Sequence, residues 1–362
     1  MHPIRYRFVP PGSMAEPGPG ELYLDTGNRL APGVIDHHQP DAPARCTSAL
    51  VLERPELVLS QVSNLAPGEP LTIVTHDAPD MDAVTAAVLV EQVLAGSVSD
   101  GARRLADYVC RIDRGETRLD PAAPITAYTI FLATARLACD RAGDDTDSVA
   151  MAALEAGARL IRRLIEQLDR EPDPAALEHA LAQAPAWAAE RELIDSDLAC
   201  YRSDLATAER LRPALPRVDG GLESVPGLWV RQPTAMLFKA WARGDVEGAA
   251  DPRGFVFLAV VLSPRRTILS VQPDQGVWLK GLGEALERAE TAKRRALGQE
   301  RRGKPRPGYD SPDPWYDGRS PLHGWTIVDA PRDGSVLTPP EIRDVLDDWI
   351  AGGGCDQPPT GA

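Results

Sequence analysis

The sequence predicts an α/β protein built as two lobes, and three observations lead to this fold class. Residues 71–94 combine a β-branched apolar strand, an acidic loop and an apolar helix, which together make a βα unit. Residues 125–211 are rich in Ala, Leu, Glu and Arg and follow a helical pattern almost throughout. Strand patterns return after the Pro- and Gly-rich residues 213–221. We therefore expect a first lobe with a mostly parallel sheet flanked by helices, then a helical connector, then a smaller C-terminal α/β lobe.

These patterns also set the expected limits of the domains. Residues 1–20 are rich in Pro and Gly, and we expect a flexible lead-in there. The first lobe should span residues 21–212 and include the helical segment 125–211. The second lobe should span residues 217–350, and a disordered tail should follow at 351–362.

The individual elements follow from hydrophobic patterning and from capping residues. In the first lobe the expected strands are residues 21–25, 34–35 and 71–75, and the expected helices are residues 49–52, 83–94 and 102–110. Thr47 or Ser48 is the expected cap of the helix at 49–52. The element at 102–110 is a helix or a helix that turns into a strand, and it ends at Asp113. In the second lobe the expected strands are residues 228–230, 255–262, 267–271 and 325–328, and the expected helices are residues 281–296 and 339–350.

Composition and charge narrow the class of function. The formal net charge of -14 disfavours a broad basic surface for long duplex nucleic acid. No stretch approaches the roughly 18 apolar residues of a membrane span, and residues 1–20 lack the apolar core of a signal peptide. The five cysteines are scattered without a CxxC pair, which disfavours a zinc knuckle or a disulfide framework. We therefore expect a cytoplasmic protein with reduced thiols and no membrane association.

Two short motifs concentrate histidine and aspartate directly after predicted strands. They are the triplet Asp36-His37-His38 and the segment HDAPDMD at residues 76–82. Ligand sites in open α/β sheets collect at the carboxyl ends of strands. A mixture of His and Asp without Cys suits Mn²⁺ or Mg²⁺, with Zn²⁺ or Fe²⁺ as alternatives. Two such ions about 3.5–4 Å apart can activate a water molecule and clamp a phosphoryl oxygen.

The spacing of Asp80 and Asp82 also favours metal binding. Both residues lie just before or at the start of the helix expected at 83–94. The exposed amide groups and the dipole at a helix N-terminus stabilise carboxylates as anions. The ionised carboxylate is the form that binds a metal ion.

Together these residues resemble the DHH phosphoesterase superfamily. This superfamily includes family II inorganic pyrophosphatases, single-strand-specific exonucleases, oligoribonucleases and cyclic-dinucleotide phosphodiesterases. The triplet at residues 36–38 is the name-giving motif, and residues 76–83 look like the HxxPDxDA motif. Residues 24–27 are similar to the acidic strand end that supplies a bridging carboxylate, and residues 112–115 look like the later Asp motif. The resemblance covers residues 21–115.

The resemblance implies a role for each of these side chains. It implies two divalent ions with His76 and Asp80 on one ion, Asp82, His37 and Asp113 on the other, and Asp25 as the bridge. It also implies that His38 faces the substrate phosphate and that Asp36 orients a histidine ring. Mn²⁺ is the expected ion, with Mg²⁺ as the alternative.

Plain structural roles stay open beside these functional ones. They are a surface turn at residues 36–38, a buried hydrogen-bonded His76, Asp25 as a turn acid before Thr26-Gly27, and Asp113 as a helix-end acid paired with Arg114 or Arg118. The chain also departs from the family in two ways. The acidic strand end and the triplet precede the HxxPDxDA motif, as in a circular permutation, and the family's GGGH segment is absent. The glycine run at 352–354 lacks the His.

The second lobe carries two features that suit a phosphorylated ligand. The first is a basic run at residues 293–306 with one acid, Glu300, and seven basic residues, Lys293, Arg294, Arg295, Arg301, Arg302, Lys304 and Arg306. Its alternative is a solvated helix end and loop. The second feature is a set of candidate substrate-binding residues, Trp315, Tyr316, Arg319 and Arg332. The aromatic rings could stack on a base, and the arginines could bind phosphate oxygens. The alternative is a turn whose aromatic side chains fill the core of the lobe.

Three functions are compatible with these residues. The first is a two-metal phosphodiesterase in which activated water attacks phosphorus in a dinucleotide or a short single-stranded oligonucleotide. The second is a phosphatase or pyrophosphatase for a small phosphorylated molecule. The third is an inactive nucleotide sensor or scaffold on the same fold. A homodimer is compatible with the helical segment at 125–211.

Overall fold

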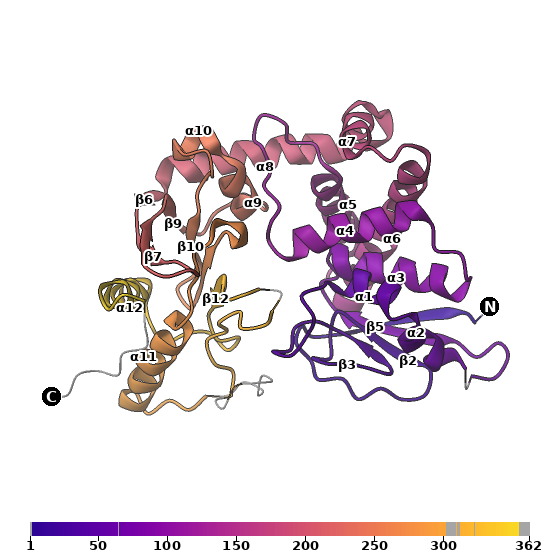
Figure 1. The fold of residues 1–362 in the computed structure, drawn as a ribbon, viewed down its shortest axis with the longest axis horizontal. Helices are drawn as coiled ribbons and strands as arrows, with labels where there is room; N and C mark the ends of the chain where they lie inside the picture. The colour runs from indigo at the N-terminus through magenta and orange to yellow at the C-terminus, as the bar shows by residue number, and fades with distance from the viewer. Residues whose placement is uncertain (1, 64, 302–308, 310–311, 322, 355–362) are drawn as a thin grey trace. The chain divides into compact units, whose positions relative to one another are not determined.

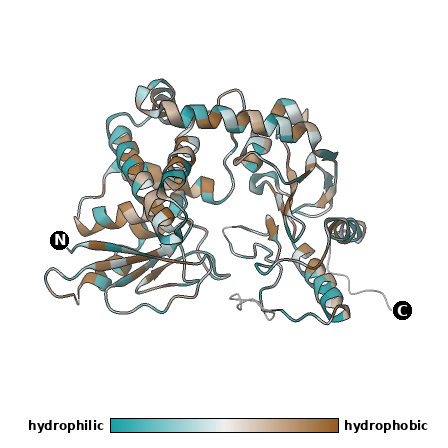
Figure 2. Ribbon diagram, turned by 180° about the vertical axis from the view of Figure 1, so that it is seen from behind, coloured by the Kyte–Doolittle hydropathy of each residue, from teal (hydrophilic) through white to brown (hydrophobic). Residues whose placement is uncertain are grey.

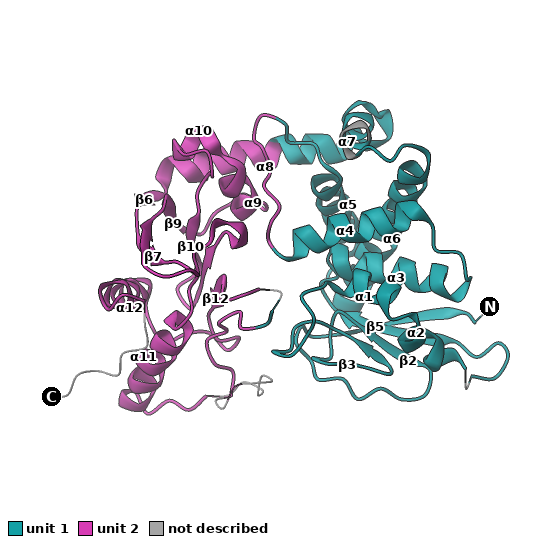
Figure 3. Ribbon diagram, in the orientation of Figure 1, with its two compact units in different colours: residues 1–114, 123–195, 320–322 teal, residues 115–122, 196–319, 323–362 magenta. Residues whose placement is uncertain are grey.

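A computed structural model of the chain describes residues 2–63, 65–301, 309, 312–321 and 323–354. The fold is α/β and divides into two compact units (Figure 3). Unit 1 comprises residues 1–114, 123–195 and 320–322, and unit 2 comprises residues 115–122, 196–319 and 323–362. Each unit has its own sheet and its own helices.

Unit 1 contains one mostly parallel sheet. Its strands are β1 (Ile4–Val9), β2 (Glu21–Leu24), β3 (Leu30–Ala31), β4 (Val34–Ile35) and β5 (Leu71–His76). The strand order is β1-β5-β2-β4-β3, and only the β3–β4 pair is antiparallel. The register places Tyr23 beside both Val34 and Val74, and these side chains form a small buried cluster with Ala15. The predicted parallel sheet is therefore confirmed.

The helices of unit 1 pack against its sheet or against one another. They are α1 (Thr47–Glu53), α2 (Pro55–Val62), α3 (Met81–Leu94), α4 (Asp100–Asp113), α5 (Ala127–Ala142), α6 (Thr146–Arg170), α7 (Pro174–Gln183), the short helix η1 (Pro185–Trp187) and the first part of α8 (Ala188–Thr207). In Figure 1, α3, α4 and α6 lie on the same side of the sheet. The Ala- and Val-rich α3 contacts β2, β5 and several of the other helices, so it is the central helix of the unit.

The N-terminal residues differ from the sequence prediction. Residues 1–20 are predicted as a flexible lead-in, but Ile4–Val9 form β1 and pair in parallel with β5 over its whole length. The reason is the alternation of Ile4, Tyr6 and Phe8 with Arg5 and Arg7, a period-two pattern typical of a strand with one solvated face. The Pro and Gly residues that suggested flexibility mostly follow this strand.

Unit 2 contains a mixed sheet and a small hairpin. The strands are β6 (Glu209–Leu211), β7 (Ala214–Pro216), β8 (Leu222–Ser224), β9 (Gly227–Arg231), β10 (Phe257–Ser263), β11 (Arg266–Val271) and β12 (Ile327–Asp329). The main sheet has the order β12-β11-β10-β9-β6, in which β9 and β10 are parallel, and β7 pairs with β8. The helices are α9 (Phe238–Gly244), α10 (Val246–Ala249), the short helix η2 (Pro273–Gln275), α11 (Leu282–Ala296) and α12 (Pro339–Ala351).

Hydrophobic side chains account for how both units hold together. In Figure 2 hydrophobic residues run along the strands of both sheets and along one face of several helices. In unit 2 the buried cluster includes Trp229, Phe257, Leu286, Trp315 and Trp349, which come from β9, β10, α11, α12 and the chain before β12. Burying each of these side chains stabilises the fold by roughly 1.5–3 kcal/mol.

The boundary between the units also differs from the prediction. The sequence places it after residue 212, but it lies between Asp195 and Ser196, inside α8. The second half of α8 belongs to unit 2 because its acids accept hydrogen bonds there. Asp197 accepts from the indole of Trp241 at 2.8 Å, and Asp204 accepts from the backbone N–H of Thr234 at 2.7 Å.

The C-terminal prediction falls partly outside the described residues. Ala351, the first residue of the predicted tail, is the last residue of α12, and Gly352 to Gly354 follow as a turn. Residues 355–362 lie outside the described residues. No helix in the described part of the chain combines the length and the apolar character needed to cross a membrane.

Candidate metal centre

The carboxyl ends of three neighbouring parallel strands carry the candidate metal ligands of unit 1. Asp25 follows β2, the triplet Asp36-His37-His38 follows β4, and His76 is the last residue of β5. Because β5, β2 and β4 are adjacent and parallel, these ends meet at one edge of the sheet. The strand order therefore explains why residues far apart in the sequence lie close together.

Two helix ends bring the remaining candidates to the same edge. Asp80 is the N-cap of α3, and its Oδ1 accepts hydrogen bonds from the backbone N–H groups of Asp82 and Ala83, each at 3.0 Å. Asp113 is the last residue of α4. The sequence leaves open a strand before Asp113, but the pattern of residues 100–113 is amphipathic and the whole segment is helical.

The candidate ligand atoms form three groups, and within each group they lie within 4.8 Å of one another. The groups are Asp25 with His76 and Asp80, His37 with Asp82 and Asp113, and Asp25 with Asp36, His37 and His38. A cation bound by nitrogen and oxygen ligands about 2.1 Å away holds neighbouring ligand atoms about 3 Å apart. The structure thus brings the eight candidate residues together at distances compatible with metal binding.

Asp25 occupies the centre of this arrangement. Its Oδ2 lies 3.3 Å from His76 Nε2, and its Oδ1 lies 3.7 Å from His37 Nε2. The backbone of Asp25 has a φ of 58°, in the left-handed region that aspartate adopts more readily than most residues. The chain turns sharply there and continues to Gly27, where a Cβ would lie 2.6 Å from Ala15 Cβ. Glycine is therefore required two residues after the acid.

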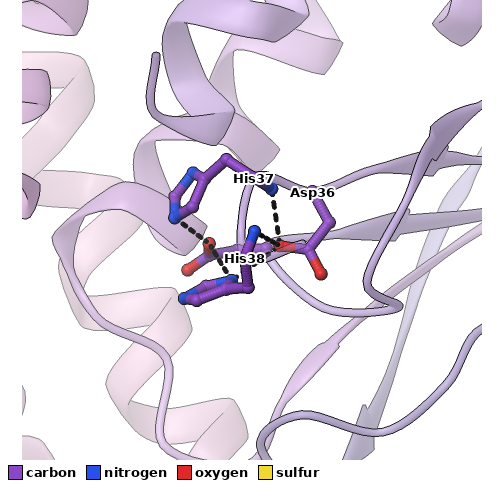
Figure 4. A group of neighbouring side chains, drawn as sticks. Asp36, His37 and His38 are labelled. Carbon is purple, nitrogen blue, oxygen red and sulfur yellow. Dashed lines mark hydrogen bonds and ion pairs between the residues drawn. The ribbon is translucent and has the colours of Figure 1, made fainter. Parts of the chain in front are cut away.

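The carboxylate of Asp36 is turned toward the other residues of the triplet (Figure 4). Asp36 Oδ1 accepts hydrogen bonds from the backbone N–H of His37 at 2.8 Å and lies 2.7 Å from His38 Nδ1. Asp36 Oδ2 accepts from the backbone N–H of Asn28 at 2.6 Å. Asp36 is buried, whereas the side chain of His38 is 39% exposed. Asp36 therefore fixes the orientation of a histidine ring that is accessible to a ligand.

Thr47 is a residue of the centre that sequence reasoning missed. It is fully buried, and its hydroxyl donates to Asp25 Oδ1 at 3.1 Å and lies 3.4 Å from His37 Nδ1. Since the single hydroxyl proton goes to Asp25, the hydroxyl oxygen accepts at His37. This contact assigns the ring proton of neutral His37 to Nδ1 and leaves the Nε2 lone pair available.

Asp82 also caps a neighbouring helix, a role that the sequence does not predict. Its carboxylate accepts hydrogen bonds from the backbone N–H groups of Thr47 at 2.7 Å and Ser48 at 2.9 Å. The two amides belong to the first turn of α1. The sequence predicts Thr47 or Ser48 as the cap of α1, but the N-cap is Cys46, which makes no side-chain capping bond. A carboxylate from α3 does the capping instead, so no local sequence signal could reveal it.

The carboxylates of the centre are not equivalent. Burial opposes ionisation of Asp25, but the hydrogen bond with His76 and the charges of the neighbouring histidines outweigh it, so the pKa of Asp25 is below its ordinary value. Burial and then the charge of Asp25 raise the pKa of Asp82 to about 8. Burial and then the charges of Asp82 and Asp25 raise the pKa of Asp113 well above its ordinary value. The centre therefore lacks enough positive charge for its carboxylates.

The three histidines of the centre also differ from one another in pKa. Burial and the proximity of His38 lower the pKa of His37 to about 4, so the His37 ring is neutral at pH 7 and its contacts with carboxylates are not ion pairs. Surrounding protein atoms disfavour a charged His38, but the carboxylate of Asp36 outweighs them and raises the pKa of His38 to about 10. Burial likewise opposes a charged His76, but the hydrogen bond with Asp25 raises its pKa to about 9.

Two buried atoms of the centre indicate what would supply the missing positive charge. His37 Nε2 and Asp113 Oδ2 lie 3.3 Å apart, and neither has a hydrogen-bond partner among the described residues. Buried polar atoms are rarely left unsatisfied in folded proteins. A divalent cation would satisfy both and would be compatible with the all-nitrogen and oxygen ligand set. The side chains present thus fit a metal ion, and the exposed residues His38 and Asp80 mark the side open to solvent.

The candidate substrate residues lie in unit 2. Trp315 is 1% exposed, and its indole N–H donates to Glu290 Oε2 at 3.3 Å, so it cannot offer a stacking face to a base. The alternative, an aromatic side chain that fills the core, describes its position. The reason is the large apolar area of the ring, which is buried among the strands and helices of this unit.

The other three candidates are at least partly accessible. Tyr316 is half-buried, and its ring lies edge-on to the ring of His323. Arg319 Nη2 lies 2.6 Å from Asp317 Oδ2, and its guanidinium lies 4.0 Å from the centre of the Tyr309 ring, so a carboxylate and a ring already hold it. Arg332 is exposed.

Three of the four described basic residues in the run are paired with acids. Lys293 contacts Glu341, Arg294 contacts Glu290 at 2.7 Å, and Arg301 contacts Glu287 at 2.6 Å. Three further basic residues of the run, Arg302, Lys304 and Arg306, lie outside the described residues. The contacts seen support a structural role for the first part of this run.

Comparison of the chain with protein-family models, with curated proteins and with solved structures finds no match in any of the three.

Proposed function

We propose that the chain is a metal-dependent phosphoester hydrolase of the DHH phosphoesterase type, with its active site at the Asp and His cluster of unit 1. The observation that carries the proposal is the position of Asp25 between two sets of ligands. One set is His76 and Asp80, and the other is His37, Asp82 and Asp113. Each carboxylate oxygen of Asp25 faces a different set. This is the arrangement expected for a carboxylate that bridges two cations.

The chain's own residues prepare the ligands for this role. Thr47 holds the His37 ring with its Nε2 lone pair toward Asp113, and the amides at the start of α1 hold Asp82. Two divalent cations, Mn²⁺ in the first place, would neutralise the carboxylates, lower the pKa of a water molecule and polarise a phosphoryl oxygen. Asp36 orients His38, whose ring is positively charged at neutral pH because its pKa is raised. A charged, partly exposed His38 suits a phosphate oxygen as a hydrogen-bond partner.

The proposed substrate is the phosphodiester of a dinucleotide or a short single-stranded oligonucleotide. The second candidate is a pyrophosphate or a small phosphomonoester. The buried position of Trp315 favours keeping this second candidate, because it removes one stacking surface that supported a nucleotide. Both candidates use the same centre.

Initial rates of Mn²⁺-dependent hydrolysis test the proposal and separate the candidates. The full chain, first treated with EDTA, is assayed with a linear dinucleotide, inorganic pyrophosphate and a phosphomonoester. We expect Mn²⁺-dependent turnover of the dinucleotide that falls at least about 1000-fold in His37→Ala and in Asp82→Asn, since loss of a metal ligand removes transition-state stabilisation of several kcal/mol.

Asp77→Ala is the matched control for these variants. Asp77 lies in the loop between His76 and Asp80 but belongs to none of the three ligand groups, so its replacement should leave the rates unchanged. Turnover of pyrophosphate alone would select the second candidate. Mn²⁺ binding without turnover of any of the three substrates would contradict a hydrolase and leave a sensor or scaffold.

A further inference from the structure

Two buried thiols lie beside the metal centre in unit 1. Cys46 is the residue before α1, and Cys110 lies in α4. Their exposed fractions are 0% and 2%, and with Ala49 they form a small buried cluster. The two cysteines are 64 positions apart in the sequence, so only the packing of α1 on α4 brings them together.

The distance between these cysteines suits a covalent bond. The sulfur of Cys110 accepts a hydrogen bond from the backbone N–H of Cys46 at 2.9 Å. Because an N–Cα bond is about 1.5 Å long, Cys46 Cα lies within about 4.4 Å of the Cys110 sulfur. The Cys110 sulfur lies about 2.8 Å from its own Cα, so the two Cα atoms are at most about 7.2 Å apart. This upper limit overlaps the Cα separations of about 4.4–6.8 Å at which disulfides form.

The neighbours of Cys110 favour its reactive form. The interaction with Cys46 lowers the pKa of Cys110 to about 7, against the effect of burial and with help from the backbone N–H of Cys46 and from Arg45. Thiolates, and not thiols, are the reactive species in oxidation. Cys46 remains the protonated partner, because burial raises its pKa. The pair thus contains one thiol prepared to react and one positioned to resolve the product.

We propose that Cys46 and Cys110 are an oxidation site, which hydrogen peroxide closes to an intramolecular disulfide, and that closure weakens cation binding at the adjacent centre. The effect on cation binding rests on the proposed function. Peroxide is the oxidant because the burial of both sulfurs excludes a bulky disulfide reagent.

The chemistry balances in two steps. The Cys110 thiolate attacks one peroxide oxygen, an S–O bond forms, the O–O bond breaks, and the leaving hydroxide takes up the proton of the original thiol to become water. The Cys46 sulfur then attacks the Cys110 sulfur, an S–S bond forms, and the S–O bond breaks. The second hydroxide takes the Cys46 proton to become water. Two thiols lose two electrons in total, and one peroxide is reduced to two water molecules.

The position of the pair explains why the bond would reach the metal centre. Cys46 is directly followed by Thr47 and Ser48, whose backbone N–H groups hold the Asp82 carboxylate. Cys110 precedes Asp113 by three residues on the same helix. Metal sites require their ligands within about 0.5 Å of the working geometry. To form the bond, the Cys110 sulfur must turn away from the backbone N–H of Cys46 at the start of α1. Closure therefore disturbs the helix start that holds Asp82 and the helix that carries Asp113.

Mass spectrometry on the full chain tests the oxidation site, and Mn²⁺ titration tests the effect of the disulfide on cation binding. Replacing the other three cysteines by Cys139→Ser, Cys200→Ser and Cys355→Ser leaves only this pair. After treatment with hydrogen peroxide, we expect a peptide cross-link between Cys46 and Cys110 and a mass loss of two hydrogen atoms. Calorimetry should show Mn²⁺ affinity reduced at least about tenfold, as for other changes in ligand support. Cys46→Ser should abolish both effects.

The outcomes separate this proposal from the proposed function. A peroxide-treated protein that carries no Cys46–Cys110 cross-link, or only sulfinic acid at Cys110, overturns the oxidation site. A cross-link that leaves Mn²⁺ affinity unchanged overturns the link to the centre. Absence of Mn²⁺ binding in the reduced protein overturns the proposed function and, with it, the effect on cation binding, whereas the cross-link is decided independently by the peptide masses.

Discussion

His37 Nε2 and Asp113 Oδ2 face each other at 3.3 Å, and neither atom has a hydrogen-bond partner in the described part of the chain. Thr47 places the ring proton of His37 on the opposite nitrogen. Without a cation, a proton on Asp113 relieves this contact, which agrees with the raised pKa of that carboxyl group. With a cation, both atoms become ligands at the separation expected of neighbours on one ion.

Asp113→Asn should separate metal binding from fold stability. The amide keeps the size of the carboxyl group but removes a charge that burial and Asp82 oppose. We expect a higher melting temperature than wild type in EDTA, together with Mn²⁺ affinity reduced at least about 100-fold. Thermal unfolding and calorimetry measure the two effects. A lower melting temperature with unchanged Mn²⁺ affinity would show that Asp113 is a structural helix-end acid.

Thr47 is expected to act through His37 and Asp25 and not through contact with the substrate. Thr47→Val keeps the shape of the side chain but removes the hydroxyl that joins both residues, whereas Thr47→Ser keeps the hydroxyl. We expect Mn²⁺ affinity to fall about 10–100-fold in the valine variant and to be largely retained in the serine variant. Equal Mn²⁺ affinities in a calorimetric comparison of the two variants would refute a positioning role.

The stability of the EDTA-treated protein should fall as pH rises from 7 to 9. The pKa of Asp82 is raised from 3.8 to about 8 and that of His76 from 6.5 to about 9, so the folded state binds these protons more tightly than the unfolded state. Stability from such groups is complete below their unfolded pKa values and is lost as pH rises through the folded values, by up to about 1.4 kcal/mol per pH unit for each proton. The pKa of His37 is lowered to about 4, so this residue changes the stability only below about pH 6.5.

Saturating Mn²⁺ should remove this loss of stability. The cation takes the place of the bound protons, so the liganded protein has no such protons to release between pH 7 and 9. Urea unfolding at several pH values, with and without Mn²⁺, measures the difference. Parallel pH profiles under the two conditions would mean that Asp82 and His76 are remote from any cation site.

The turn that presents Asp25 should tolerate no side chain at Gly27. A Cβ there would lie 2.6 Å from Ala15 Cβ and 2.7 Å from Val34 Cγ1, at a φ of 113°. We expect Gly27→Ala to destabilise the protein by about 2–4 kcal/mol from overpacking and backbone strain. Gly68→Ala is the control, since Gly68 also has a positive φ but no atom within 4 Å, and it should cost only about 1 kcal/mol. Equal free energies of unfolding for the two variants would contradict the close packing at Gly27.

Trp315 should matter for the stability of unit 2 and not for the choice of substrate. Its ring is 1% exposed and belongs to the buried cluster of that unit. We expect Trp315→Ala to lower the free energy of unfolding by about 3–5 kcal/mol. Selective loss of dinucleotide turnover with unchanged stability would contradict this position and restore the stacking role.

Much of unit 1 could be predicted from local patterns. The β-branched run at 71–75 and the apolar helix after it are β5 and α3, and the acids at 80 and 82 lie where the helix begins. The triplet at 36–38 follows a strand, as its apolar neighbours indicate. These predictions succeed because strand, cap and helix signals act over a few residues.

The parts that the sequence could not reveal depend on distant contacts. Thr47 looks like an ordinary helix cap, yet it joins Asp25 to His37 because α1 packs beside the sheet edge. Trp315 lies in a turn-like segment with Gly and Asp, and only the fold of unit 2 shows that it is buried. The unit boundary inside α8 is set by where Asp197 and Asp204 find their hydrogen-bond partners, which no helical pattern records.

Calorimetric titration of the EDTA-treated full chain with MnCl₂ tests the central claim most directly. The geometry around Asp25, His37 and His76 predicts binding of two Mn²⁺ ions per chain, with release of protons that makes the measured heat depend on the buffer. His37→Ala should lose at least one of the two binding events. A titration with no binding heat in any buffer, confirmed by equilibrium dialysis, would contradict the metal centre and the hydrolase proposed from it.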